Sequence, residues 1–381
     1  MSRAADAAGR CGRAGGDREQ KPWYVRPERG APRMSVQPEM TDRTARRVHP
    51  ELVPAFESLP QLPDPYADIE ATRQEFHEML ATFPADRTGV CSERFGIPRA
   101  DGGVLTVEVY RPEGAAGAVP EEGANGAAPG SGGDALPAVL HFHGGGFALG
   151  RSLPGQDRVA LELCRELPAV VLTVEYRLAP EHRYPAGVED CYLALEWAAG
   201  RAAELGIDPG RIAVAGKSAG GGLSAAVALM ARDRGGPALA FQSLCVPDLD
   251  DRVGADETAD AEGAGDARVL DGHGVQTSWQ HYLPEGTATA EAYAAPARAL
   301  ELSGLPPAHV LVCDLDPMRD AGLAYARRLM DAGVPVTVRN VPGAWHGFEL
   351  YAADTRVAKE MTAHWTGQLR AALYPVCPAV V

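Results

Sequence analysis

The sequence predicts an α/β fold with a mostly parallel central sheet flanked by helices. Two observations predict it. Short, apolar, partly β-branched runs alternate along the 381 residues with longer windows of helical periodicity, which is the pattern of repeated βαβ units. The runs are apolar throughout rather than alternating, as expected for parallel strands that are covered on both faces.

The individual elements follow from these runs. Buried parallel strands are expected at 138–142, 169–174, 212–215, 240–245, 308–313 and 335–339. Helices are expected at 155–167, 187–204, 219–233, 317–332 and 353–373. The alternating segment 104–110 is expected to be an edge strand of a hairpin.

Three segments have the composition of irregular chain. Residues 1–45 are rich in Arg, Gly and Pro without periodicity, and they are expected to be a disordered basic extension. A basic tail that binds an acidic partner is the functional alternative, and Met34 and Met40 leave the start codon open beside Met1. Mobile insertions are expected at about 112–137, which is low in complexity, and at about 249–275, which is acidic.

Charge and cysteine content exclude several classes of function. Residues 1–47 hold 11 Lys/Arg and 6 Asp/Glu, a net +5, and the remainder holds 25 and 45, a net −20. The acidic body argues against nucleic acid and anionic membranes as partners. The seven cysteines form no C-x-x-C pair and no metal-ligand cluster, so no metal or cofactor is expected. Without a signal peptide or long apolar span, a cytoplasmic location is expected.

Gly216-Lys-Ser-Ala-Gly220 directly follows the predicted strand 212–215. A G-x-S-x-G pentapeptide in a strand–turn–helix context is typical of a nucleophile elbow, which lifts a serine hydroxyl clear of the backbone. Gly216 and Gly220 leave space where a Cβ would collide with the neighbouring strand and helix. The motif alone is weak evidence, because small-residue clusters recur in Ala/Gly-rich chains.

Three further sequence features accompany Ser218. The glycine loop His143-Gly-Gly-Gly146 follows one predicted strand, and its N–H groups can converge on an oxyanion. Asp316, before a proline, follows the strand 308–313, and His346 lies on a Gly-flanked loop after the strand 335–339. The order serine, acid, histidine is that of α/β-hydrolases rather than of other serine hydrolases.

With these residues the chain resembles the hormone-sensitive-lipase family of bacterial esterases and lipases, which has the α/β-hydrolase fold. The resemblance runs from about residue 45 to about residue 373 and includes Tyr176-Arg-Leu-Ala-Pro-Glu-His182 and Trp345-His-Gly-Phe348. It implies a helical cap over the active site in residues 46–95, where two short helices are expected between Pro50 and Phe83. Residues 96–375 would then form the catalytic domain.

The resemblance also implies roles for single residues. The nucleophile would be Ser218, the general base and acid His346, and the orienting carboxylate Asp316, with Asp320 and Asp314 as rival acids. The oxyanion hole would consist of the N–H groups of Gly145, Gly146 and Ala219. His143 and Gly144 would shape the glycine loop, and His141 is expected to be a core histidine.

Lys217 departs from the family pattern, which usually has an acidic or small residue before the serine. It is one of three lysines beside 33 arginines (36 − 3). The ammonium is expected either to reach solvent or to act as a cation beside the nucleophile, where it would disfavour protonation of His346.

These features predict hydrolysis of short- to medium-chain carboxylic esters through an acyl-enzyme. The expected partners are a small-molecule ester and, in a homodimer, a second copy of the chain. Two alternatives stay open. The same site could serve an acyltransferase, lactonase or dehydratase-type biosynthetic enzyme, or the chain could be a non-catalytic ligand-binding receptor.

Overall fold

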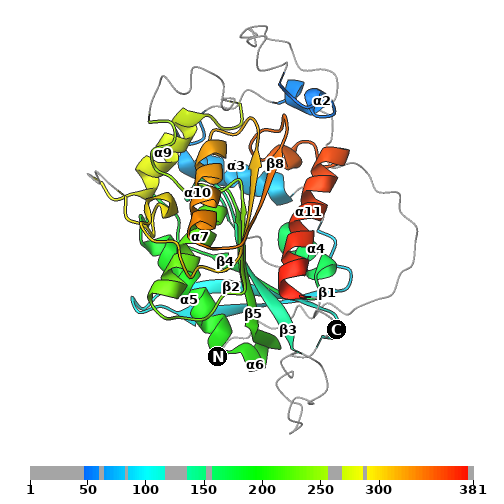
Figure 1. The fold of residues 1–381 in the computed structure, drawn as a ribbon, viewed down its shortest axis with the longest axis vertical. Helices are drawn as coiled ribbons and strands as arrows, with labels where there is room; N and C mark the ends of the chain where they lie inside the picture. The colour runs from blue at the N-terminus through cyan, green and yellow to red at the C-terminus, as the bar shows by residue number, and fades with distance from the viewer. Residues whose placement is uncertain are drawn as a thin grey trace, which may run out of the picture. The chain divides into compact units, whose positions relative to one another are not determined.

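Eight strands form one sheet in the order β1-β2-β4-β3-β5-β6-β7-β8 (Figure 1). The strands are β1 (Val90–Pro98), β2 (Val104–Pro112), β3 (Leu136–Phe142), β4 (Val170–Glu175), β5 (Ile207–Lys217), β6 (Phe241–Cys245), β7 (Ala308–Cys313) and β8 (Val336–Val341). β2 pairs antiparallel with both β1 and β4, and the other neighbours are parallel. The predicted α/β class with a mostly parallel sheet is confirmed.

This computed structural model describes residues 47–59, 64–81, 85–115, 135–151, 157–255, 268–285 and 290–375. The predicted basic extension lies outside the described residues, as do the central parts of the two predicted insertions.

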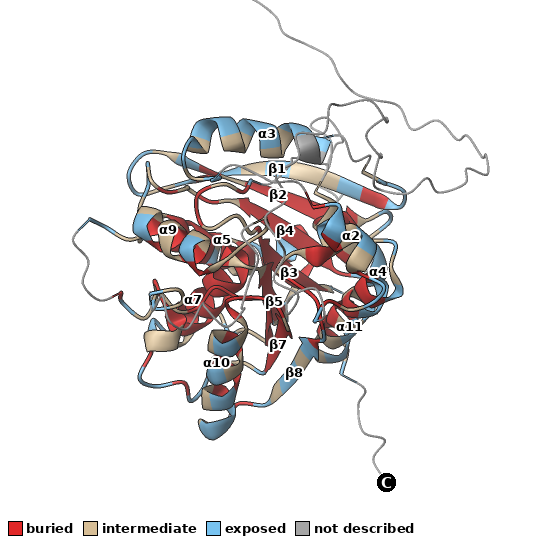
Figure 2. Cartoon of the chain, turned by 90° about the horizontal axis from the view of Figure 1, so that it is seen from above, coloured by how far each residue is buried: buried red, intermediate tan, exposed pale blue. Residues whose placement is uncertain are grey.

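Helices cover both faces of the sheet. They are α2 (Val53–Glu57), α3 (Ile69–Ala81), α4 (Arg158–Glu166), α5 (Ala186–Gly200), α6 (Ala202–Leu205), α7 (Ala219–Asp233), α9 (Gly272–Tyr282), α10 (Arg319–Asp331) and α11 (Arg356–Leu373), with short 3-10 helices η1 (Pro296–Arg298) and η2 (Phe348–Leu350). Figure 2 shows α4 and α11 on one face and α5, α7, α9 and α10 on the other. The buried apolar residues accordingly form clusters on either side of the sheet.

Local sequence explains where several elements begin. Asp157, Asp271 and Thr355 each accept a hydrogen bond from the backbone N–H three residues later, so they cap the N-termini of α4, α9 and α11. β3, β4, β6 and β7 are buried along nearly their whole length, as their largely apolar sequences favour. Because β3, β5, β7 and β8 run parallel, they all end at the same edge of the sheet. The candidate residues follow them there.

The structure corrects three expectations. The segment 104–110 forms a hairpin strand, β2, but the edge strand is its partner β1, which alternates too weakly to be recognised. β1 also takes residues 90–95 out of the predicted helical region 46–95, so α2 and α3 are the helices of that region. Within the predicted insertion 249–275 the structure places the beginning of α9, a helix that the acidic composition obscured.

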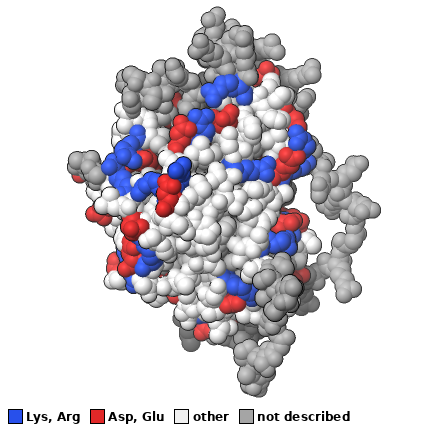
Figure 3. Space-filling model, viewed as in Figure 1, with Lys and Arg blue, Asp and Glu red and all other residues white. Residues whose placement is uncertain are grey.

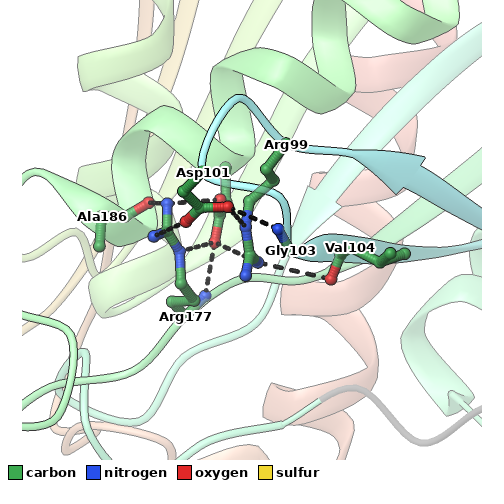
Figure 4. Close-up of polar contacts among 7 residues, drawn as sticks. Arg99, Asp101, Gly103, Val104, Arg177 and Ala186 are labelled. Atoms are coloured by element: carbon green, nitrogen blue, oxygen red, sulfur yellow. Dashed lines mark hydrogen bonds and ion pairs between the residues drawn. The ribbon is translucent and has the colours of Figure 1, made fainter.

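A network of charges fastens the β1–β2 turn to the segment before α5 (Figure 4). Arg177 donates to both carboxylate oxygens of the buried Asp190 at 2.9 Å and to Asp101 at 3.1 Å. Arg99 donates to Asp101 from the other side at 3.3 Å. Arg177 therefore holds these segments together.

The visible surface mixes both signs of charge. In Figure 3 basic and acidic side chains lie beside one another around a broad uncharged area. Exposed charges of opposite sign also pair among the described residues, such as Arg356 with Glu51 at 2.9 Å and Arg327 with Asp331 at 2.9 Å. Such a face lacks the single-sign patch that a nucleic-acid backbone would need. Among the described helices, none combines the length and the apolar character needed to cross a bilayer.

Candidate active site

Ser218 occupies a strained turn between β5 and α7. Its backbone has φ 57° and ψ −126°, a left-handed conformation that non-glycine residues seldom adopt. A Cβ on Gly216 would come within 2.3 Å of the backbone of Gly220, and one on Gly220 within 2.0 Å of the Phe142 carbonyl oxygen. The turn is thus as tight as the sequence motif requires, and both glycines are needed for it.

Asp316 and His346 lie in contact at the same edge of the sheet. Asp316 follows β7 and His346 follows β8, and the Nδ1 atom of His346 is 2.7 Å from Oδ2 of Asp316. The Asp316 side chain is 1% exposed, and its Oδ1 accepts a hydrogen bond from the N–H of Met318 at 2.9 Å. A buried carboxylate on Nδ1 directs the other ring nitrogen, Nε2, away from it.

The two rival acids face elsewhere. Asp314 and Asp320 both pair with Arg319, at 3.5 Å and 2.7 Å, and Asp320 is largely exposed. Asp314 also accepts a long hydrogen bond, 3.4 Å, from the N–H of Gly343. Of the three carboxylates, the structure brings Asp316 to His346.

The glycine loop lies directly against the serine. A Cβ on Gly144 would be 2.9 Å from the carbonyl oxygen of Lys217 and 3.3 Å from Cβ of Ser218. Gly145 and Gly146 have φ values of 117° and 55°, in the positive region that glycine adopts most readily. Between described residues, the N–H groups of Gly145, Gly146 and Ala219 donate no backbone hydrogen bond. Those donors are available to a ligand.

His143 belongs to the support of the glycine loop, whereas His141 is a buried residue of β3. The hydroxyl of Tyr176 donates to the carbonyl oxygen of His143 at 2.8 Å, and its ring stacks on His143 at 4.2 Å. Nδ1 of His143 lies 2.8 Å from the Gly144 carbonyl oxygen, as expected for a loop-shaping residue. Burial lowers the pKa of His143 to about 4 and that of His141 to about 3, so both stay neutral.

The region before β1 reaches over the glycine loop. A Cβ on Gly146 would be 2.1 Å from the Tyr66 hydroxyl. From α3, Arg73 donates to the carbonyl oxygens of Ala148 and Ala179 at 2.7 Å and pairs with Glu181 at 2.8 Å. These contacts hold α3 beside the loop that follows β3.

Charges around His346 determine its protonation. Burial lowers the pKa of His346, but the carboxylate of Asp316, assisted by Glu349 and Asp248, outweighs burial and raises the pKa above the usual 6.5. The neutral ring that can accept a proton therefore predominates only above that raised pKa. The net shift is thus opposite to the one expected from Lys217, whose charge is paired with Glu349 at 2.9 Å.

Asp248 is a residue that the sequence interpretation missed. It is 3% exposed, its N–H donates to the Ser218 carbonyl oxygen at 3.1 Å, and its carboxylate accepts from Nε1 of Trp279 at 3.0 Å. Burial raises its pKa to about 7, although nearby His346 acts in the opposite direction. Its place just after the predicted strand 240–245 is the signal that could have identified it.

The described residues hold no cluster of three or more His, Cys, Asp or Glu side chains suited to a metal ion. The chemistry available at this edge of the sheet is that of a hydroxyl, an imidazole bonded to a carboxylate, and converging N–H groups.

Comparison with known proteins agrees with this arrangement. A family described as having the alpha/beta hydrolase fold matches residues 139–350. The carboxylesterase NlhH of Mycobacterium tuberculosis is 43% identical over 246 residues, which are 63% of this chain and 75% of that protein. An arylesterase of Saccharolobus solfataricus is 39% identical over 231 residues, 59% and 71% of the two chains.

Comparison with solved structures also points to esterases, and it covers more of the chain. A bacterial heroin esterase matches with a TM-score of 0.76 and 37% identity, covering 87% of this chain and 99% of its own. The chain therefore belongs to the hormone-sensitive-lipase family of serine ester hydrolases, which has the α/β-hydrolase fold.

Proposed function

We propose that this protein hydrolyses short- to medium-chain carboxylic esters by way of an acyl group bound to Ser218. The observation that supports it most is the 2.7 Å contact between His346 and the buried Asp316, at the sheet edge where Ser218 is presented on a strained turn. Esterase relatives at 37–43% identity support the reaction class.

Acylation would proceed in two steps through a tetrahedral oxyanion. Oγ of Ser218 attacks the ester carbonyl carbon while Nε2 of His346 takes its proton. The carbonyl oxygen becomes an oxyanion, which the N–H groups of Gly145, Gly146 and Ala219 stabilise, assisted by the N-terminus of α7. The imidazolium, stabilised by Asp316, then protonates the alkoxide as the C–O bond breaks, and the alcohol leaves.

Deacylation would repeat these steps with water as the nucleophile. His346 removes a proton from water, the hydroxide attacks the acyl carbon, and the second oxyanion occupies the same N–H groups. Its collapse returns the proton to Oγ of Ser218 and releases the carboxylic acid. An alcohol or amine acceptor in place of water would give acyl transfer through the same intermediate. The cytoplasmic location and the homodimer stay predictions from the sequence.

A series of p-nitrophenyl esters tests this function. We expect kcat/KM to be highest for acyl chains of short to medium length, and to be unchanged by EDTA because the reaction uses side chains and backbone N–H groups. Product analysis with added alcohols separates hydrolysis from acyl transfer. Absence of ester turnover by the folded protein would contradict the proposal.

A further inference from the structure

The residue before the nucleophile is held by the loop that carries the histidine. Lys217 is the last residue of β5, and its Nζ atom lies 2.9 Å from Oε1 of Glu349. Glu349 belongs to η2, three residues after His346. A single ion pair thus connects the strand that ends just before Ser218 to the segment that follows His346, although its partners lie 132 positions apart in the sequence.

This ion pair is largely withdrawn from solvent. The side chains of Lys217 and Glu349 are 23% and 16% exposed. Nζ of Lys217 also lies 5.2 Å from the centre of the Trp365 ring of α11. That ring is itself fixed, because Nε1 of Trp365 donates to Oγ of Ser243 in β6 at 2.9 Å. The Glu349 carboxylate and the Trp365 ring therefore restrict the position of the ammonium group, whereas a surface ion pair has no such restriction.

Both partners are charged at neutral pH. Burial lowers the pKa of Lys217, but the charge of Glu349, the nearby Cys245 of β6 and Glu162 of α4, and the hydrogen bond to Glu349 together outweigh burial, so the net shift is upward. Burial raises the pKa of Glu349, but the charge of Lys217 and the hydrogen bonds that Glu349 accepts together outweigh burial, so the net shift is downward. Separating the two would leave an uncompensated charge in a confined space.

We propose that the Lys217–Glu349 pair is a clamp that fixes the histidine loop against the nucleophile strand. Both are positioning residues, and neither is assigned a contact with substrate. Glu349 has a second effect, because its carboxylate faces His346 together with Asp316 and Asp248. This inference rests on the proposed ester hydrolysis and goes beyond it by assigning a role to two residues outside the reacting set.

The test compares Lys217→Met, Glu349→Gln and the double variant in ester hydrolysis. Because misplacement of reacting groups by about 1 Å can cost about 100-fold, we expect each single variant to lower kcat by about 10- to 100-fold with little change in KM. The double variant should lose no more than the worse single variant, since both remove one interaction. Lys217→Arg, which keeps the charge, should restore most of the rate.

The pH profile separates the clamp from a purely structural effect. Activity requires neutral His346 and rises as pH rises through its raised pKa. Removing the negative charge of Glu349 lowers that pKa, so Glu349→Gln should move the acid limb of kcat/KM to lower pH, and Lys217→Met should not. A variant that only loosened packing would lower the melting temperature and leave the limb in place.

Matched controls lie at the other end of the same strand. Arg211 and Asp208 form a comparable pair, 2.6 Å, at the beginning of β5. Arg211→Met and Asp208→Asn should leave kcat and the acid limb unchanged. If Lys217→Met does not fold, Glu349→Gln and Lys217→Arg carry the test. If the wild type is active and Glu349→Gln has the same kinetics, the clamp is wrong and the proposed function stands. If the wild type is inactive, the proposed function is wrong.

Discussion

Replacing Ser218 with alanine is expected to lower kcat for p-nitrophenyl esters by about 10⁶-fold, the scale seen when a serine hydrolase loses its nucleophile. The proposed route forms its covalent bond through Oγ of Ser218, and no other described hydroxyl is placed on the strained turn between β5 and α7. Residual turnover would come from the N–H groups of Gly145, Gly146 and Ala219 acting on bound ester and water.

The control for this variant is folding. Alanine occupies the same backbone and removes one half-buried hydroxyl, so the melting temperature should stay close to that of the wild type. Stopped-time assays with enough protein to detect about 10⁻⁶ of the wild-type rate are needed. Turnover within tenfold of the wild type in the Ser218→Ala variant would contradict the assignment of the nucleophile.

Replacing Asp316 with asparagine is expected to lower kcat by about 10⁴-fold. An amide can present its N–H₂ group to Nδ1 of His346, which favours the tautomer that carries its proton on Nε2, and that nitrogen can then no longer accept one from Ser218. The amide also removes the charge that stabilises the imidazolium. The 2.7 Å contact and the 1% exposure of Asp316 leave little room for solvent to substitute.

Two neighbouring carboxylates provide matched controls for Asp316→Asn. Asp314→Asn and Asp320→Asn remove the same charge nearby, yet both side chains pair with Arg319. We expect their kcat values to stay within about twofold of the wild type, because surface pairs contribute little. If Asp320→Asn lost activity and Asp316→Asn kept it, the acid would be misassigned.

Most of the buried strands were predictable because their physical requirement is local. β7 begins and ends where the run 308–313 does, and β6 differs from its predicted range by one residue. A strand covered on both faces is apolar at most positions, and such a run is visible in one sequence. The strand expected to be buried at 335–339 is instead β8, an edge strand with exposed positions. The candidate residues followed, since parallel strands β5, β7 and β8 all end at the same edge.

The features that the sequence did not predict depend on contacts between residues that are distant in the sequence. β1 is a strand because β2 lies beside it, and its own sequence, with exposed positions on both faces, lacks a clear period of two. Lys217 was expected to reach solvent or to disfavour protonation of His346, and the structure gives it Glu349 instead. Asp248 was missed for the same reason, because its contact with Trp279 joins residues that are distant in the sequence.

Labelling with a fluorophosphonate probe is the decisive test of Ser218 as the nucleophile, because Oγ of an activated serine replaces fluoride on phosphorus and the adduct is stable. We expect one adduct per chain, located by peptide mass spectrometry at Ser218 and formed far more slowly in Asp316→Asn. An adduct on another residue, or ester turnover that persists in protein fully labelled at Ser218, would contradict it.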